Sequence, residues 1–147
     1  MLRRNRWMVV APLVAGALFA GCRHKTATAA KVQPAKIEHI EGQEVSRITL
    51  TERAAQRLDI KTVTVGGPQL TRSGLRSIIP YAAVLYDTKG DTWVYTSPEN
   101  LVYIRQRIMV DYIERDQAVL TEGPPAGTQV VTVGGQELFG AEFEIGH

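Results

Sequence analysis

The chain has 147 residues, and its 17 basic residues nearly balance its 15 acidic residues. Three of the basic residues lie among the first six positions, so the part after residue 21 is close to neutral. It carries no basic face of the kind that binds nucleic acid. The single cysteine excludes an internal disulfide, so a packed core must hold the fold together.

The first 21 residues have the order of an export signal. An arginine-rich start precedes an apolar run from Trp7 to Phe19, and small residues follow it. A membrane-spanning helix needs about 20 apolar residues, whereas this run is shorter and contains Pro12. We therefore interpret residues 1–21 as a removable signal peptide.

The only cysteine lies directly after this segment, in the tetrad Phe19-Ala20-Gly21-Cys22. This tetrad resembles the lipobox of bacterial lipoproteins. The resemblance implies a covalent lipid on Cys22 and attachment to the periplasmic side of the cell envelope. Several acyl chains make such an attachment effectively permanent. The alternative is an ordinary signal peptide beside a free thiol.

The remaining chain divides into a linker, one domain and a tail. Residues 22–43 are rich in Ala, Thr and Lys and keep neither a helical nor an alternating apolar period, which predicts a flexible tether. Residues 44–140 have the size of one small domain. Residues 141–147 are expected to form a C-terminal tail.

Three elements are predicted at the start of the domain. Residues 45–50 are typical of a short strand. Thr51 can cap a helix that runs from Glu52 to about Leu58. Residues 60–65 then alternate apolar and polar side chains before a Gly-Gly-Pro stop, which predicts a second strand.

An antiparallel hairpin is predicted further along the chain. Residues 69–77 are polar and poorly periodic, but residues 78–86 are dense in strand-forming types. Residues 87–91 have the composition of a turn, and residues 92–96 alternate cleanly. The two runs should therefore pair through this turn.

The longest strand signal covers residues 102–112. Apolar side chains recur at every second position, with one polar interruption, while Arg105, Arg107 and Asp111 fall on the opposite face. The pattern predicts that the apolar face is buried and that the opposite face meets solvent. The residues of the apolar face are Val102, Ile104, Ile108, Val110 and Tyr112.

Two further short strands complete the domain, at residues 118–121 and 129–133, with a Pro/Gly loop between them. Six or seven short strands with one short helix predict a mainly β fold. The expected architecture is a small antiparallel β-barrel or roll.

Spaced motifs in the second half of the chain resemble the last domain of a known family. The family is that of the periplasmic adaptor subunits, or membrane fusion proteins, of bacterial efflux pumps of the resistance-nodulation-division (RND) class. The matching residues are Ile79-Pro80 with Ala83-Val84-Leu85, Trp93-Val94-Tyr95, and Val130-Val131 with Gly134 and Leu138. Residues 48–52 and 58–62 resemble the start of the same membrane-proximal domain, with Asp59 where the family often has glycine.

In full adaptors these two stretches lie at opposite ends of the chain and close into one domain. The family inserts a helical hairpin, a lipoyl-like module and a second barrel between them. Here only about ten residues separate the stretches, and no segment keeps the heptads of a helical hairpin. The resemblance therefore implies a truncated or accessory adaptor that docks onto an RND pump or a full-length adaptor. Adaptor function favours the inner membrane, whereas Arg23 favours the outer membrane.

Catalysis is not expected. All three histidines lie outside the predicted core, and Ser73 and Ser77 have no histidine nearby. Met109 is the only methionine after the signal, which argues against a site for soft metals. No cofactor other than the lipid on Cys22 is expected. A barrel this small is normally filled by its own side chains, so a small-molecule ligand is not expected either.

Aromatic and basic side chains are the candidates for partner docking, because they supply much of the energy at interfaces. Core packing is favoured for Trp93 and Tyr112, while both roles are open for Tyr103. Arg105 and Arg107 are candidate contacts for acids on a pump, against the alternative of solvated surface charges. A different class also stays open: a free-standing envelope lipoprotein with a structural or ligand-binding role.

Overall fold

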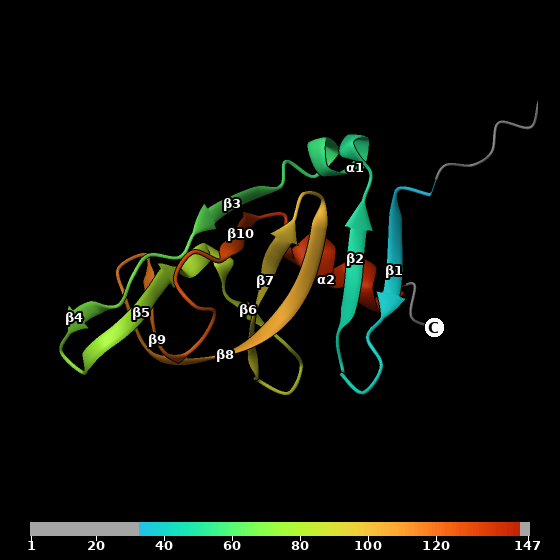
Figure 1. Ribbon diagram of the computed structural model, residues 1–147. Coiled ribbons are helices and arrows are strands. Elements are labelled where there is room, and N and C mark those ends of the chain that lie inside the picture. Colours follow the sequence, from blue (N-terminus) through green and yellow to red (C-terminus); the bar gives the residue numbers. More distant parts are fainter. Residues whose placement is uncertain (1–32, 145–147) are drawn as a thin grey trace, which may run out of the picture. The chain divides into compact units, whose positions relative to one another are not determined.

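The computed structural model describes residues 33–144, which contain ten β-strands, two α-helices and one 3-10 turn (Figure 1). The predicted signal peptide, Cys22 and the first part of the predicted tether lie outside the described residues. The strands are β1 (Ala35–His39), β2 (Ser46–Leu50), β3 (Lys61–Thr64), β4 (Gln69–Thr71), β5 (Gly74–Pro80), β6 (Leu85–Tyr86), β7 (Thr92–Glu99), β8 (Val102–Glu114), β9 (Gln117–Glu122) and β10 (Gln129–Val133). The helices are α1 (Glu52–Arg57) and α2 (Gly135–Glu144), and the 3-10 turn is η1 (Tyr81–Ala83).

The strands form one curled antiparallel sheet. Its main path has the order β3-β10-β7-β8-β9-β5-β4, and β2 and β6 join it at β8 and β7. Strand β1 pairs with β2 and extends the sheet on that side. Figure 1 shows how the sheet curls between β8 and β5 without closing into a full barrel. The predicted mainly β fold, an antiparallel roll, is confirmed.

Two stretches that are separate in the sequence share this sheet. Strand β2 pairs with β8, with Ile48 opposite Tyr103. Strand β3 pairs with β10, with Val63 opposite Val130. Residues 45–65 and 79–133 therefore fold together as one unit.

Helix α1 agrees with its prediction. The Thr51 hydroxyl accepts a hydrogen bond from the Ala54 amide at 3.2 Å, which satisfies a free N–H of the first turn. The helix ends at Leu58, and Asp59 follows with φ of 50°. This left-handed conformation is the usual way to end a helix, and it favours glycine over residues with a Cβ.

The tether prediction is wrong for residues 35–39, which form β1. This strand pairs with the whole length of β2, from Ala35 opposite Leu50 to His39 opposite Ser46. Ile37 packs against the core. One central apolar residue is too few to produce a visible alternating pattern, because the backbone ladder to β2 supplies much of the strand's support.

The strand predicted at residues 78–86 is interrupted. Residues 78–80 belong to β5 and pair with β9, and η1 turns the chain after Pro80. Only Leu85 and Tyr86 pair with β7, so the predicted hairpin is confirmed for its last two residues. Residues 69–77 contain a further hairpin, in which Leu70 of β4 lies opposite Leu75 of β5.

The apolar side chains form two clusters, one on each face of the central strands. The first cluster lies between the sheet and α2, and the second fills the curled part of the sheet. The first contains Val45, Ile48, Leu50, Ala54, Leu85, Trp93, Tyr95, Tyr103, Val131 and Leu138. The second contains Val65, Ile79, Ala83, Val84, Val94, Ile108, Ala118, Leu120 and Val130.

The prediction for the two faces of β8 holds only in its second half. There Ile108 is buried while Arg107 and Asp111 are exposed. In the first half Tyr103 and Arg105 are buried as well, although they lie on the face predicted to meet solvent. Helix α2 covers that face, and this helix was not predicted.

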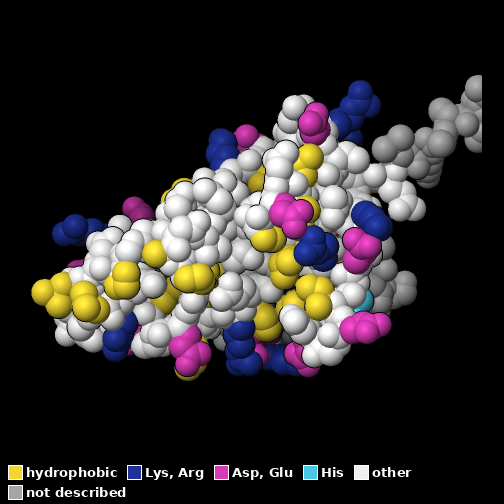
Figure 2. Space-filling model, in the orientation of Figure 1, with side chains coloured by type: hydrophobic (Ala, Val, Ile, Leu, Met, Phe, Trp, Pro, Cys, Tyr) yellow, Lys and Arg dark blue, Asp and Glu magenta, His cyan; other side chains and the backbone are white. Residues whose placement is uncertain are grey.

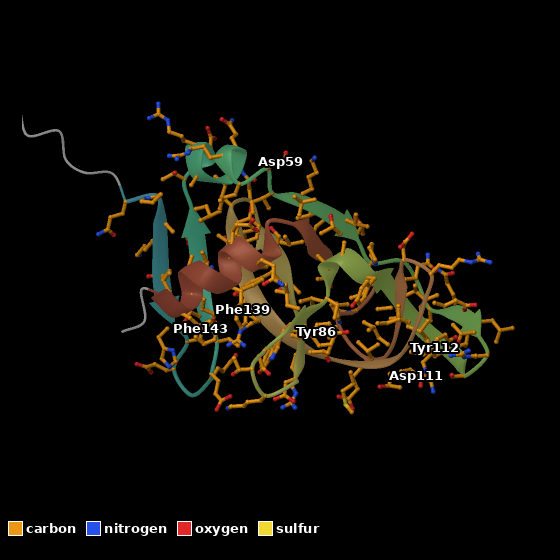
Figure 3. The ribbon with its side chains drawn as sticks, turned by 180° about the vertical axis from the view of Figure 1, so that it is seen from behind. Asp59, Tyr86, Asp111, Tyr112, Phe139 and Phe143 are labelled. Atoms are coloured by element: carbon orange, nitrogen blue, oxygen red, sulfur yellow. The ribbon has the colours of Figure 1, made fainter. Side chains whose placement is uncertain are left out.

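The predicted C-terminal tail is wrong for residues 141–144, which belong to α2. Figure 3 shows α2 lying across the sheet, and Leu138 and Glu142, one helical turn apart, are both buried against it. Gly134 precedes the helix with φ of 87°, and a Cβ at this position would overlap the Ile60 side chain. Two glycines and a buried acid hide the helical pattern of this segment in the sequence.

Candidate docking surfaces

The structure separates the three predicted docking residues. Tyr103 and Arg105 are only 5% exposed, so the prediction that they form a docking surface is wrong. Arg107 is exposed and forms an ion pair with Asp91 on the loop between β6 and β7. Of the three predicted residues, only Arg107 can therefore reach a partner.

Arg105 holds helix α2 on the sheet. Its guanidinium Nε lies 3.2 Å from Glu142 Oε2, and both side chains are 4% exposed. Its Nη2 donates to the Glu44 carbonyl at 2.9 Å. Glu142 also accepts from the Ser46 amide at 3.0 Å, so the carboxylate links α2 to β2 and β8. Such a pair offsets its loss of hydration only when its remaining polar atoms are also satisfied.

Tyr95 completes this group, which we call the Arg105 cluster (Tyr95, Arg105 and Glu142). The Tyr95 hydroxyl donates to Glu142 Oε2 at 2.5 Å. Burial raises the pKa of Tyr95 well above its ordinary value, and the hydrogen bond to the Glu142 carboxylate raises it further. The hydroxyl therefore stays protonated and remains a donor across the physiological pH range.

Aromatic rings surround the guanidinium of Arg105. Its Cζ lies 4.1 Å from the centroid of Trp93, 5.1 Å from that of Phe143 and 5.6 Å from that of Phe139. These rings form one wall of a groove of about 470 Å³ beside α2. Figure 3 labels Phe139 and Phe143 on the helix. We call this hollow the α2 groove; it is lined by Glu44, Asp87, Thr88, Lys89, Asp91, Trp93, Arg105, Phe139 and Phe143.

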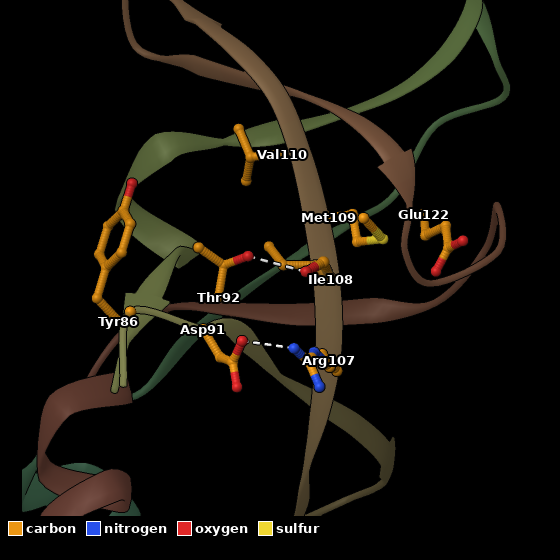
Figure 4. Close-up of a pocket in the computed structure, with 9 residues that line it drawn as sticks. Tyr86, Asp91, Thr92, Arg107, Ile108, Met109, Val110 and Glu122 are labelled. Carbon is orange, nitrogen blue, oxygen red and sulfur yellow. Dashed lines mark hydrogen bonds and ion pairs between the residues drawn. The ribbon is translucent and has the colours of Figure 1, made fainter. Parts of the chain in front are cut away.

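A second, more open hollow of about 650 Å³ lies beside Arg107 (Figure 4). The ion pair between Arg107 and Asp91 crosses it, and Thr92 donates its hydroxyl to the Ile108 carbonyl beneath it. Tyr86 and Met109 stand at its margins and are half exposed.

The most exposed apolar side chains lie at the end formed by β4 and β5. Figure 2 shows hydrophobic side chains gathered there. Leu70 is 83% exposed and Leu75 is 65% exposed, and they face each other across the hairpin. Arg72 in the turn stacks on Tyr112 of β8, with Cζ 3.5 Å from the ring centroid. We call Leu70, Arg72, Leu75 and Arg76 the hairpin patch.

The aromatic docking candidates also differ in how deeply they are buried. Trp93 is buried in the first cluster, as the favoured prediction had it. Tyr112 is half-buried and supports the β4–β5 turn through its contact with Arg72. Sequence reasoning missed Leu70 and Leu75 because residues 69–77 lack a regular period. Glu142 was missed because a buried carboxylate has no sequence signal without its partner.

Among residues 33–144, no three His, Cys, Asp or Glu side chains are close enough together to hold a metal ion. No helix in the same range has the length and apolar content needed to cross a bilayer.

Comparisons with protein-family models, with curated proteins and with solved structures gave no match for this chain.

Proposed function

We propose that this chain is a lipid-anchored accessory or truncated adaptor of an RND-type efflux complex. It acts without catalysis, by docking onto the pump or onto a full-length adaptor at the periplasmic side of the cell envelope. Residues 1–21 direct export, and Cys22 carries the lipid. The adaptor-like module begins at β1.

The pairing of β2 with β8 and of β3 with β10 is the observation that carries this proposal. The resemblance requires residues 45–65 and residues 79–133 to close into a single sheet, although a full adaptor separates them by three inserted modules. In this chain the same stretches join through the short β4–β5 hairpin. A short connection also lowers the entropic cost of closing the sheet.

Asp59 gives independent support for the resemblance. It occupies the position where the family often has glycine, and its φ of 50° is in the region that favours glycine. A family preference for glycine is expected where the backbone after a helix must be left-handed.

The positions of the two ends of the module fit an anchored adaptor. Figure 1 shows β1, which follows the tether, at one end of the sheet and the β4–β5 hairpin at the other. The hairpin also stands at the point in the chain where full adaptors insert their other modules. In this proposal the hairpin replaces the modules that a full adaptor carries at this point of the chain.

Purification from membranes in mild detergent tests the proposal. A C-terminally tagged chain should bring an RND pump or a full-length adaptor with it in stoichiometric amounts. A chain recovered repeatedly as a lone monomer, under conditions that keep other envelope complexes intact, would contradict the proposal.

Lipidation has a separate test. Mass spectrometry of the mature N-terminus should find acylated Cys22, and Cys22→Ser should release the protein from the membrane fraction. An unmodified thiol at the mature N-terminus would show that the chain is an ordinary exported protein.

The α2 groove favours a second candidate, a free-standing envelope lipoprotein that binds a small ligand. Its volume of about 470 Å³ and its aromatic wall suit a drug-sized molecule. Trp93, the only tryptophan after the signal, reports on the groove. A saturable change in its fluorescence on titration with 1-anilinonaphthalene-8-sulfonate, lost in Phe143→Ser, would support this candidate. An unchanged Trp93 fluorescence would exclude binding of this aromatic anion in the α2 groove.

A further inference from the structure

Strand β4 presents an unpaired edge. It is the last strand of the sheet path, and within the described residues it pairs only with β5. Natural edge strands are commonly protected by a charged side chain, a proline or a bulge within the strand. The sequence Gln69-Leu70-Thr71 contains none of these. Only the short length of β4 protects this edge from pairing with another strand.

The charged side chains of the hairpin itself have one sign, and the acid Asp111 lies next to Tyr112, on which Arg72 stacks (Figure 3). No acidic residue lies between Gly66 and Pro80, whereas Arg72 and Arg76 flank the exposed leucines. Neither arginine takes part in any of the ion pairs between residues 33 and 144. The hairpin patch is therefore an apolar surface with a positive rim, and its complement is an apolar surface that carries acids.

Two other occupants fit less well. A second copy bound through the same hairpin would offer no acid to Arg72 or Arg76, because no acidic residue lies between Gly66 and Pro80. A lipid surface would suit leucines with arginines. However, a lipid surface has no strand backbone that could pair with the free edge of β4.

From these observations we infer that the β4 edge is the docking site for an acid-bearing edge strand of a full-length adaptor. The inference rests on the proposed function and assigns it a surface. The incoming strand adds main-chain hydrogen bonds to β4, buries Leu70 and Leu75, and places its acids beside Arg72 and Arg76.

Binding between the purified lipoprotein in detergent and a purified full-length RND adaptor from the same cells tests this inference. The double variant Leu70→Asp, Leu75→Asp should weaken binding by about tenfold or more, because it places charge in the centre of the contact. The double variant Arg72→Glu, Arg76→Glu should also weaken binding and should reduce its dependence on salt.

Val63→Asp provides the matched control. Val63 is 42% exposed and lies on β3, the strand at the other end of the sheet path. This variant should bind the adaptor within about twofold of the wild-type chain. Unfolding midpoints in urea should be compared for all variants, so that a loss of binding is not confused with a loss of fold.

Each contrary result has a distinct meaning. If both hairpin variants bind the adaptor as strongly as the wild-type chain does, the inference is overturned and the proposed function still stands. A wild-type chain that binds neither adaptor nor pump would overturn both. Self-association in sedimentation that is lost in the leucine variant would assign the edge to a second copy. Binding to vesicles of phosphatidylglycerol that is lost in the leucine variant would assign it to a lipid surface. Either result would also overturn the inference.

Discussion

The part of the sheet beneath α2 and the β4–β5 hairpin use similar residues in opposite ways. Beneath α2, Arg105 is surrounded by aromatic rings and paired with Glu142, and both side chains are 4% exposed. At the β4–β5 end, Leu70 is 83% exposed and Arg72 also stacks on an aromatic ring, but at the surface. The first arrangement stabilises the fold, and the second leaves apolar and basic side chains in contact with solvent.

This comparison shows why residue type alone did not locate a docking surface. Arg105 and Arg107 lie two positions apart on the same face of β8 and have the same chemistry. Helix α2 covers Arg105 but leaves Arg107 exposed, with 61% of its side chain accessible. The role of each arginine is therefore decided by what packs on it from a distant part of the chain.

The largest expected loss of stability follows from breaking the Arg105 cluster. Glu142→Leu leaves a buried guanidinium without its counter-ion, and Arg105→Met leaves a buried carboxylate. Each single variant should lower the free energy of unfolding by about 3–5 kcal/mol. Urea unfolding followed by Trp93 fluorescence measures this, since Trp93 packs on Arg105.

The double variant and a control sharpen that test. Arg105→Met with Glu142→Leu should lose less than the sum of the single losses, because no unpaired charge remains. Arg107→Met removes an exposed arginine from the same strand and should cost less than about 1 kcal/mol. Equal losses for Arg105→Met and Arg107→Met would refute the contrast between the two arginines.

The next effect concerns Tyr95 and pH. Tyr95→Phe removes a hydrogen bond to a charged group and should cost about 1.5–3 kcal/mol at neutral pH. The folded-state pKa of Tyr95 is raised by burial, so the folded chain keeps this proton above pH ~10 while the unfolded chain loses it. The free energy of unfolding should therefore fall as the pH rises above about 10.

A pH series of urea unfolding up to about pH 11 checks the sign of this effect. Tyr95→Phe should flatten the fall. Burial also raises the pKa of Tyr103, so Tyr103→Phe should flatten it further. A wild-type stability that rises above pH ~10 would contradict the burial of these hydroxyls.

A smaller effect on the free energy of unfolding is expected at the end of α1, the helix that connects β2 to β3. Asp59→Gly relieves the left-handed backbone strain at φ of 50° and should raise the free energy of unfolding by about 0.5 kcal/mol. The gain is reduced by the loss of its exposed ion pair with Lys61, which contributes little. A clear loss of stability would show that the Asp59 side chain matters more than its backbone.

The sequence predicted those parts of the fold whose causes are local. Thr51 marks the start of α1 because a hydroxyl at that position satisfies a helix amide, and Leu85–Tyr86 pair with β7 because a turn composition separates the two runs. The mainly β class followed from alternating runs that each need a partner to bury one face.

What the sequence did not predict depends on distant contacts. The residues of β1 are ordered by their ladder to β2. Glu142 is explained only by distant partners, among them Arg105, which lies 37 residues away in the chain. Arg105 was placed on an exposed face, and both roles were left open for Tyr103, because α2 was not recognised. Leu70 and Leu75 belong to a hairpin so short that no period can be read from it.

The smallest expected effect is on stability at the hairpin patch. Leu70→Ser and Leu75→Ser replace side chains that are largely in solvent, so each should change the free energy of unfolding by less than about 0.5 kcal/mol. Leu138→Ser is the matched comparison, because this leucine of α2 is fully buried against the sheet and its loss should cost several times more. Urea unfolding of the three variants measures the difference directly. If Leu70→Ser were as costly as Leu138→Ser, the hairpin leucines would be part of the core, and the β4 edge would have nothing left to offer a partner.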